Sequence, residues 1–150
     1  MSAERSFVSK LLGVLMLAMV ALNSIPSQAL AFTIDVNNPY SEKMDVAFID
    51  FEDQVGKWRI HGWFSVNPAT TRRINMPSST MRNYIYMYVQ TANARWSGEG
   101  IPSSMVYTVV GNAFNYYEGQ SAPAGPNRRQ VFFVKYELDK GFMYWTPDSE

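Results

Sequence analysis

The chain has 150 residues, with 13 Lys and Arg, 13 Asp and Glu, one His and no Cys. This length suits one domain rather than two, and the balanced charge argues against a nucleic-acid-binding protein, because neutralising many phosphates takes a clear excess of Lys and Arg. Without Cys the chain forms neither disulfides nor thiolate metal sites. We therefore expect no cofactor or metal, and a core built from the 4 Trp, 9 Tyr and 9 Phe.

The first 31 residues have the three parts of a secretory signal peptide. Arg5 and Lys10 form a basic start, residues 11–22 form an apolar run, and Ala29-Leu30-Ala31 matches an A-x-A cleavage site. The alternative is a membrane anchor, but the apolar run is shorter than the about 20 residues that span a bilayer. We expect cleavage of this signal helix after Ala31, no stable membrane anchor afterwards, and a periplasmic or extracellular domain at 32–150.

Short β-rich runs separated by Gly, Pro and Asn turns follow the signal segment. Residues 33–36 begin the series, and residues 44–51 are apolar on both faces, which predicts a strand covered on both sides. Residues 57–66 alternate, so the period of a strand predicts two faces. One face carries Trp58, Ile60, Gly62, Phe64 and Val66, and the other carries Lys57, Arg59, His61, Trp63 and Ser65.

The later strands are expected at 70–76, 84–90, 105–110, 114–117, 130–138 and 142–145, with loops at 92–104 and 118–129. A polar C-terminal tail ends the chain, and no amphipathic helix appears after the signal segment. Six to eight short strands of this kind predict an all-β domain, either an antiparallel β-sandwich or a small barrel.

His61 is the residue that a His-based mechanism would have to use. Nucleophilic catalysis would need a Ser beside it and a carboxylate behind it, and no Ser lies in a G-x-S-x-G motif. We interpret His61 as a half-exposed strand residue, and the acidic group Asp50, Glu52 and Asp53 as a solvated turn. The alternative function is a small secreted hydrolase that uses His61 with a carboxylate such as Asp50.

The aromatic residues give a stronger signal for binding. Tyr84, Tyr86 and Tyr88 share one face of a strand, and an exposed row of rings can stack on sugars or peptide. The alternative is that these rings form cross-strand pairs inside the protein. The whole predicted ligand-binding surface is Trp63, Tyr84, Tyr86, Tyr88 and Trp96, with Arg72 and Arg73 at the rim. It predicts an exported, non-catalytic β domain that binds a glycan, the cell wall or an envelope protein.

Several short pieces occur in a familiar order: Asn37 or Asn38, Val46-Ala47-Phe48, Trp58 before Gly62-Trp63, Pro68, the tyrosines of 84–88 and Trp96-Ser97-Gly98. This order, over residues 37–98 and with a looser match at Phe132-Phe133, resembles the small, mostly secreted bacterial proteins of domain-of-unknown-function family 1036. Those proteins often carry a cysteine soon after the Pro-Gly that follows the Gly-Trp strand, and residues 68–72 here contain none. The resemblance implies a compact exported β domain and supplies no catalytic residues.

Overall fold

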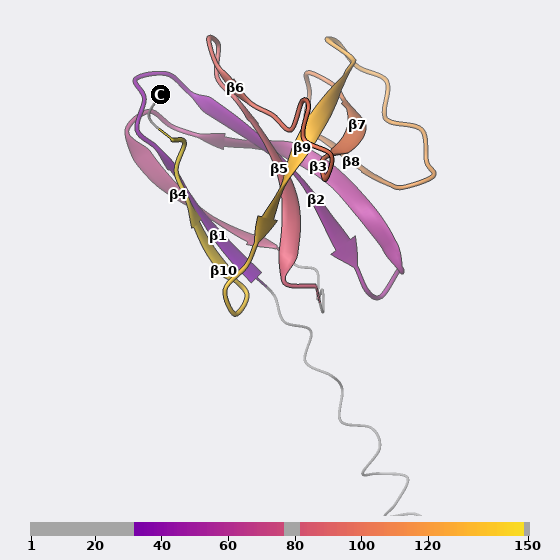
Figure 1. The fold of residues 1–150 in the computed structure, drawn as a ribbon. Coiled ribbons are helices and arrows are strands. Elements are labelled where there is room, and N and C mark those ends of the chain that lie inside the picture. The colour runs from indigo at the N-terminus through magenta and orange to yellow at the C-terminus, as the bar shows by residue number, and fades with distance from the viewer. Residues whose placement is uncertain (1–31, 77–81, 149–150) are drawn as a thin grey trace, which may run out of the picture.

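The computed structural model describes residues 32–76 and 82–148, so the expected signal segment lies outside the described residues. The described residues form ten strands and no helix (Figure 1), which confirms the all-β class and exceeds the expected six to eight strands. Within these residues there is no helix long and apolar enough to cross a membrane. The strands are β1 (Phe32–Asn38), β2 (Met44–Glu52), β3 (Lys57–Val66), β4 (Thr70–Met76), β5 (Tyr84–Gln90), β6 (Arg95–Trp96), β7 (Met105–Val109), β8 (Phe114–Tyr117), β9 (Arg129–Glu137) and β10 (Phe142–Trp145).

The strands form two sheets of different size. The small sheet has the order β10-β1-β4, and the large sheet has the order β7-β9-β5-β2-β3-β8, with β6 added beside β5. All pairs are antiparallel except β1 with β10, which run parallel with Thr33 opposite Phe142. The expectation of a purely antiparallel fold is therefore wrong at this pair, because the chain leaves the large sheet after β9 and β10 joins the small sheet on the free side of β1.

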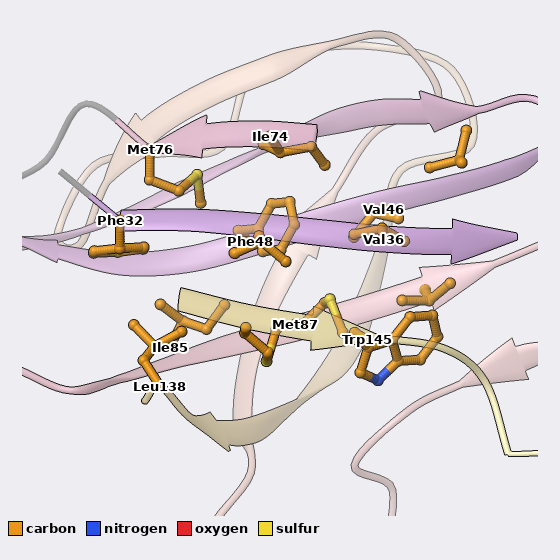
Figure 2. Packing of buried hydrophobic residues seen from close by; sticks show 14 of the residues in the cluster. Phe32, Val36, Val46, Phe48, Ile74, Met76, Ile85, Met87, Leu138 and Trp145 are labelled. Atoms are coloured by element: carbon orange, nitrogen blue, oxygen red, sulfur yellow. The ribbon is translucent and has the colours of Figure 1, made fainter. Parts of the chain in front are cut away.

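A hydrophobic core lies on each face of the large sheet. The first core fills the space between the two sheets (Figure 2) and contains Phe32, Val36, Val46, Phe48, Ile74, Met76, Ile85, Met87, Leu138 and Trp145. The second core lies where the large sheet curls toward a nearly closed six-stranded barrel, and contains Ala47, Ile49, Ile60, Tyr88, Val109, Val110, Phe114, Tyr116, Val131 and Phe133. β2 contributes to both cores, which confirms that it is covered on both sides.

The alternation of β3 reverses at a β-bulge. Ala47 pairs with Gly62 and Val46 with Phe64, so Trp63 has no partner residue on β2. Because a bulge places two successive residues against one, Trp58 lies against the second core while Phe64 lies against the first. The single face predicted for Trp58 through Val66 is therefore wrong.

Candidate functional site

The tyrosine row of β5 is engaged in contacts within the protein. Tyr88 is only 1% exposed, so it has no surface to offer a ligand. Tyr84 and Tyr86 are half-buried, and their ring centroids lie 6.1 and 5.6 Å from the ring of Trp58. Lys135 Nζ lies 4.2 Å from the centre of the Tyr84 ring. The row is therefore an aromatic cluster with a cation against one ring, rather than an open stacking platform.

Trp63 faces the interior rather than the solvent. Its indole Nε1 donates a hydrogen bond to the carbonyl oxygen of Val110 at 2.7 Å. Its ring packs edge-on against Phe114, with 5.5 Å between the ring centroids. The outward position predicted for Trp63 is wrong because the bulge turns its side chain toward the second core. Its hydrogen bond ties β3 to the end of β7, which helps to close the curled sheet.

The paired arginines Arg72 and Arg73 lie on β4 in the small sheet, whereas the tyrosine row lies in the large sheet. Arg73 donates two hydrogen bonds to the carboxylate of Asp35, at 2.8 and 2.7 Å, and these lower the pKa of Asp35. Arg72 donates to the carbonyl oxygen of Ser65 at 2.6 Å. The structure therefore does not bring the seven predicted surface residues together.

A buried charged cluster joins β2 to β3. Asp50 is fully buried, and Arg59 and His61 are 9% and 8% exposed, so the expectations of a solvated Asp50 and a half-exposed His61 are wrong. Arg59 donates to both carboxylate oxygens of Asp50, at 3.3 and 2.8 Å, and lies 3.6 Å from Glu52. Tyr117 donates to Glu52 at 2.7 Å, and this hydrogen bond raises the pKa of Tyr117.

His61 is the member of this cluster that bears on catalysis. Its Nε2 lies 2.7 Å from Asp50 Oδ1, but it makes no hydrogen bond of good geometry. The rings of Phe48 and Phe64 lie 6.1 and 5.4 Å from its imidazole ring. The serines of 32–76 and 82–148 make no hydrogen bond to His61. The pair therefore has the carboxylate and base of a triad, and among the described residues no nucleophile donates a hydrogen bond to His61.

A groove of about 630 Å³ opens where the β1–β2 connection, the β5–β6 connection with β6, and the segment after β10 meet at one end of the molecule. In Figure 1 the C-terminal end lies beside the connection between β1 and β2, and β6 lies toward the same end. The groove is lined by Pro39, Tyr40, Glu42, Thr91, Asn93, Ala94, Arg95, Trp96, Pro147 and Asp148. Of the predicted surface only Trp96 lies in it.

Two aromatic rings form the apolar part of the groove. The rings of Tyr40 and Trp96 stack with 5.6 Å between centroids and 28° between planes. Trp96 also packs edge-on against Trp145, 6.2 Å away, which anchors it on the first core. Both groove rings remain partly exposed. Trp96 therefore packs on the first core and also borders the groove.

The turn that carries Tyr40 is fixed by a buried asparagine. The Asn38 side chain is fully buried, and its Nδ2 donates to the carbonyl oxygens of Glu42, Val66 and Asn67, at 2.8, 3.1 and 3.2 Å. Its Oδ1 accepts from the backbone N–H of Tyr40 at 3.0 Å. Because these bonds hold the connection at several points, the ring of Tyr40 is positioned before any ligand arrives.

Polar groups complete the groove. Asn93 Nδ2 donates to Glu42 Oε2 at 3.1 Å and so links the two loops that form its walls. Thr91 Oγ1 accepts from the backbone N–H groups of Asn93 and Ala94, which shapes the turn between β5 and β6.

Tyr136 is not part of the groove lining, but its pKa responds to the groove residue Asp148. Burial raises the pKa of Tyr136, a hydrogen bond from Trp145 opposes this rise, and the negative charge of Asp148 adds to it.

The sequence interpretation missed Tyr40, Glu42, Asn93 and Asp148. A weak signal was available, since Tyr40 follows an Asn-Asn-Pro turn and Trp96 lies in a Gly/Ser loop, and both rings lie at strand ends. Among 32–76 and 82–148 no group of His, Cys, Asp and Glu is arranged to hold a metal ion. Comparisons with family models, with curated proteins and with solved structures give no significant match.

Proposed function

We propose that the domain at 32–150 is an exported, non-catalytic binding module that holds a saccharide in the groove lined by Tyr40 and Trp96. The observation that carries this proposal is the stacked, partly exposed ring pair at the wall of a cavity. The signal-like segment at 1–31 supports a role at the cell envelope or outside the cell. A glycan is the favoured partner over an envelope protein, because the site is a groove with a polar rim.

The chemistry of the groove suits a sugar. A pyranose ring has an apolar C–H face that can pack on an aromatic ring, which buries area on both partners. Its hydroxyls are both donors and acceptors, and the groove offers the carboxylates of Glu42 and Asp148 and the amide of Asn93 as partners. A cavity with an aromatic wall and a few convergent polar groups is the usual form of a small-ligand site.

The test is a titration of the purified protein with oligosaccharides of glucose, galactose and N-acetylglucosamine, in which calorimetry and tryptophan fluorescence measure binding. An aromatic packing contact is worth about 0.5–1.5 kcal/mol beyond the area that it buries, so Tyr40→Ala and Trp96→Ala should each weaken binding about two- to tenfold. The matched control is Tyr144→Ala, because Tyr144 is 56% exposed on β10 and lies outside the groove.

Thermal unfolding of each variant separates loss of binding from loss of folding. Trp96 packs against Trp145, so its replacement lowers stability as well, whereas Tyr40 lies in a connection outside both cores. Saccharide binding that survives both Tyr40→Ala and Trp96→Ala in folded protein would refute the groove as the site. Absence of binding to every saccharide at millimolar concentration would refute the function.

The second candidate is the hydrolase that uses His61 with Asp50, favoured by the 2.7 Å contact between them. It predicts that the protein cleaves some of the oligosaccharides or their esters, and that His61→Ala abolishes the cleavage. Product analysis by mass spectrometry over long incubations tests it, and cleavage that persists at the same rate in His61→Ala would eliminate His61 as the base.

A further inference from the structure

The charged residues of the groove do not neutralise one another. Glu42 and Asp148 lie in its lining, and among the described residues neither forms an ion pair; Glu42 accepts only from the neutral amide of Asn93. The nearest basic neighbour in sequence, Lys43, is paired with Asp45 at 3.2 Å. Arg95 is the one cation in the lining. The groove therefore carries one negative charge in excess.

The two aromatic rings favour a cation in the groove, as the excess negative charge does. The face of a Trp or Tyr ring has a negative potential and attracts an ammonium group placed over it. A cation in the groove would lie near the carboxylates of Glu42 and Asp148 and beside the stacked ring pair of Tyr40 and Trp96. A carboxylate or a sulfate on the ligand would be repelled by Glu42 and Asp148, and Arg95 is the one lining residue that would attract it.

We propose, resting on the saccharide-binding function above, that the sugar recognised by this groove carries a free primary ammonium group, as in a glucosamine unit. Such a group has three N–H donors and no acceptor, which suits a site with two carboxylates. An N-acetylated unit of the same shape has lost this charge. The groove should therefore distinguish the two forms by charge, while the ring stacking holds the pyranose of either form.

The test compares a glucosamine hexamer with an N-acetylglucosamine hexamer by calorimetry at low ionic strength, below the pKa of the sugar amine. We expect the glucosamine hexamer to bind about tenfold more tightly, since a charge-assisted hydrogen bond in a partly buried site is worth about one order of magnitude. The preference should shrink as salt is raised, because the charges are partly exposed to screening.

Replacing the charged residues of the groove should raise or lower the affinity for the same pair of ligands in a direction that depends on the charge removed. Glu42→Gln should weaken glucosamine binding about three- to tenfold and Asp148→Asn about two- to threefold, because Asp148 is exposed. Arg95→Gln should strengthen it. N-acetylglucosamine binding should change less in all three variants. Asp139→Asn is the matched control, because Asp139 is an exposed acid in the turn between β9 and β10 and is not part of the groove.

The outcomes separate this inference from the proposed function. Equal affinity for the two hexamers, with no response to Glu42→Gln, would overturn the ammonium preference and leave saccharide binding intact. Tighter binding of the N-acetylated hexamer would also overturn it. Failure of both hexamers and of every other saccharide to bind would overturn both proposals together.

Discussion

Replacing Gly62 by alanine is expected to destabilise the domain by about 1–3 kcal/mol, the usual cost of overpacking a core. A Cβ at Gly62 would lie 2.9 Å from Ala47 Cβ, 3.1 Å from Ala47 Cα and 3.1 Å from Phe114 Cζ. Two of these atoms belong to the strand directly opposite, where Ala47 pairs with Gly62. β2 would have to move away from β3 at the bulge, and the hydrogen bonds of both strands resist that movement.

Urea unfolding, monitored by tryptophan fluorescence, measures this cost. In thermal unfolding, a loss of 1 kcal/mol should lower the melting temperature by about 4 °C in a domain of this size. Ala47→Gly removes the closest atom and alone should cost about 1 kcal/mol for a glycine in a strand. The double variant Gly62→Ala with Ala47→Gly should therefore lose about 1 kcal/mol less stability than the two single variants lose in sum, since the effects of neighbouring substitutions are not additive.

The control is Gly56→Ala, which has a positive φ of 69° but nothing within 4 Å of the added Cβ. Ala47→Gly should give no rescue there. The reasoning would be refuted if Gly62→Ala cost less than about 0.5 kcal/mol, the range of an ordinary surface substitution, or if its cost and that of Ala47→Gly were simply additive.

Three further predictions concern polar groups that are buried or half-buried. Arg59→Met should cost about 3–5 kcal/mol in urea unfolding, because it leaves the buried Asp50 carboxylate without its bidentate partner; adding Asp50→Asn should recover part of that loss, and a cost below about 1 kcal/mol would contradict this. Asn38→Ala should cost about 1–3 kcal/mol by leaving buried carbonyls unsatisfied, and should also weaken saccharide binding by calorimetry; unchanged binding would show that the turn does not position the groove. Burial and the charge of Glu118 raise the pKa of Tyr107 to about 12 from 10.0, so the free energy of unfolding should fall as the pH rises from about 10 through 12. Urea unfolding at a series of pH values measures this fall. The fall should be smaller in Tyr107→Phe, and an equal fall in that variant would refute the assignment.

The fold class follows from the sequence because it depends on local patterns. Runs such as 44–51 and 84–90 carry the β-rich residues and the period of strands, and turns with Pro, Gly or Asn separate them. β6 was missed because Arg95 and Trp96 are two residues inside a loop and show no period. The bulge was missed because both faces of β3 are covered: apolar residues before and after Gly62 satisfy either core, so the pattern does not record the reversal.

The charged cluster and the groove depend on information that local patterns lack. Asp50 meets Arg59 because the register of β2 on β3 places them opposite each other, and sequence alone does not fix that register. The turn-like composition around Asp50 therefore gave the wrong impression of a solvated site. The groove joins Tyr40 from the β1–β2 connection, Trp96 from β6 and Asp148 from the segment after β10, and only the packing of the two sheets brings these to one end.

Packing accounts for many of the rings in the strands of this protein. A domain without Cys has two cores to fill on opposite faces of one sheet, so rings that point to opposite faces, such as Phe48 and Tyr88, are both buried. The tyrosine row had a strong period for that reason, and the period reflects packing. Tyr40 lies beyond the end of β1, and Trp96 lies in a two-residue strand, where neither core encloses a side chain fully. Both rings therefore keep part of their surface outside the cores, which makes them better candidates for binding than the buried Tyr88.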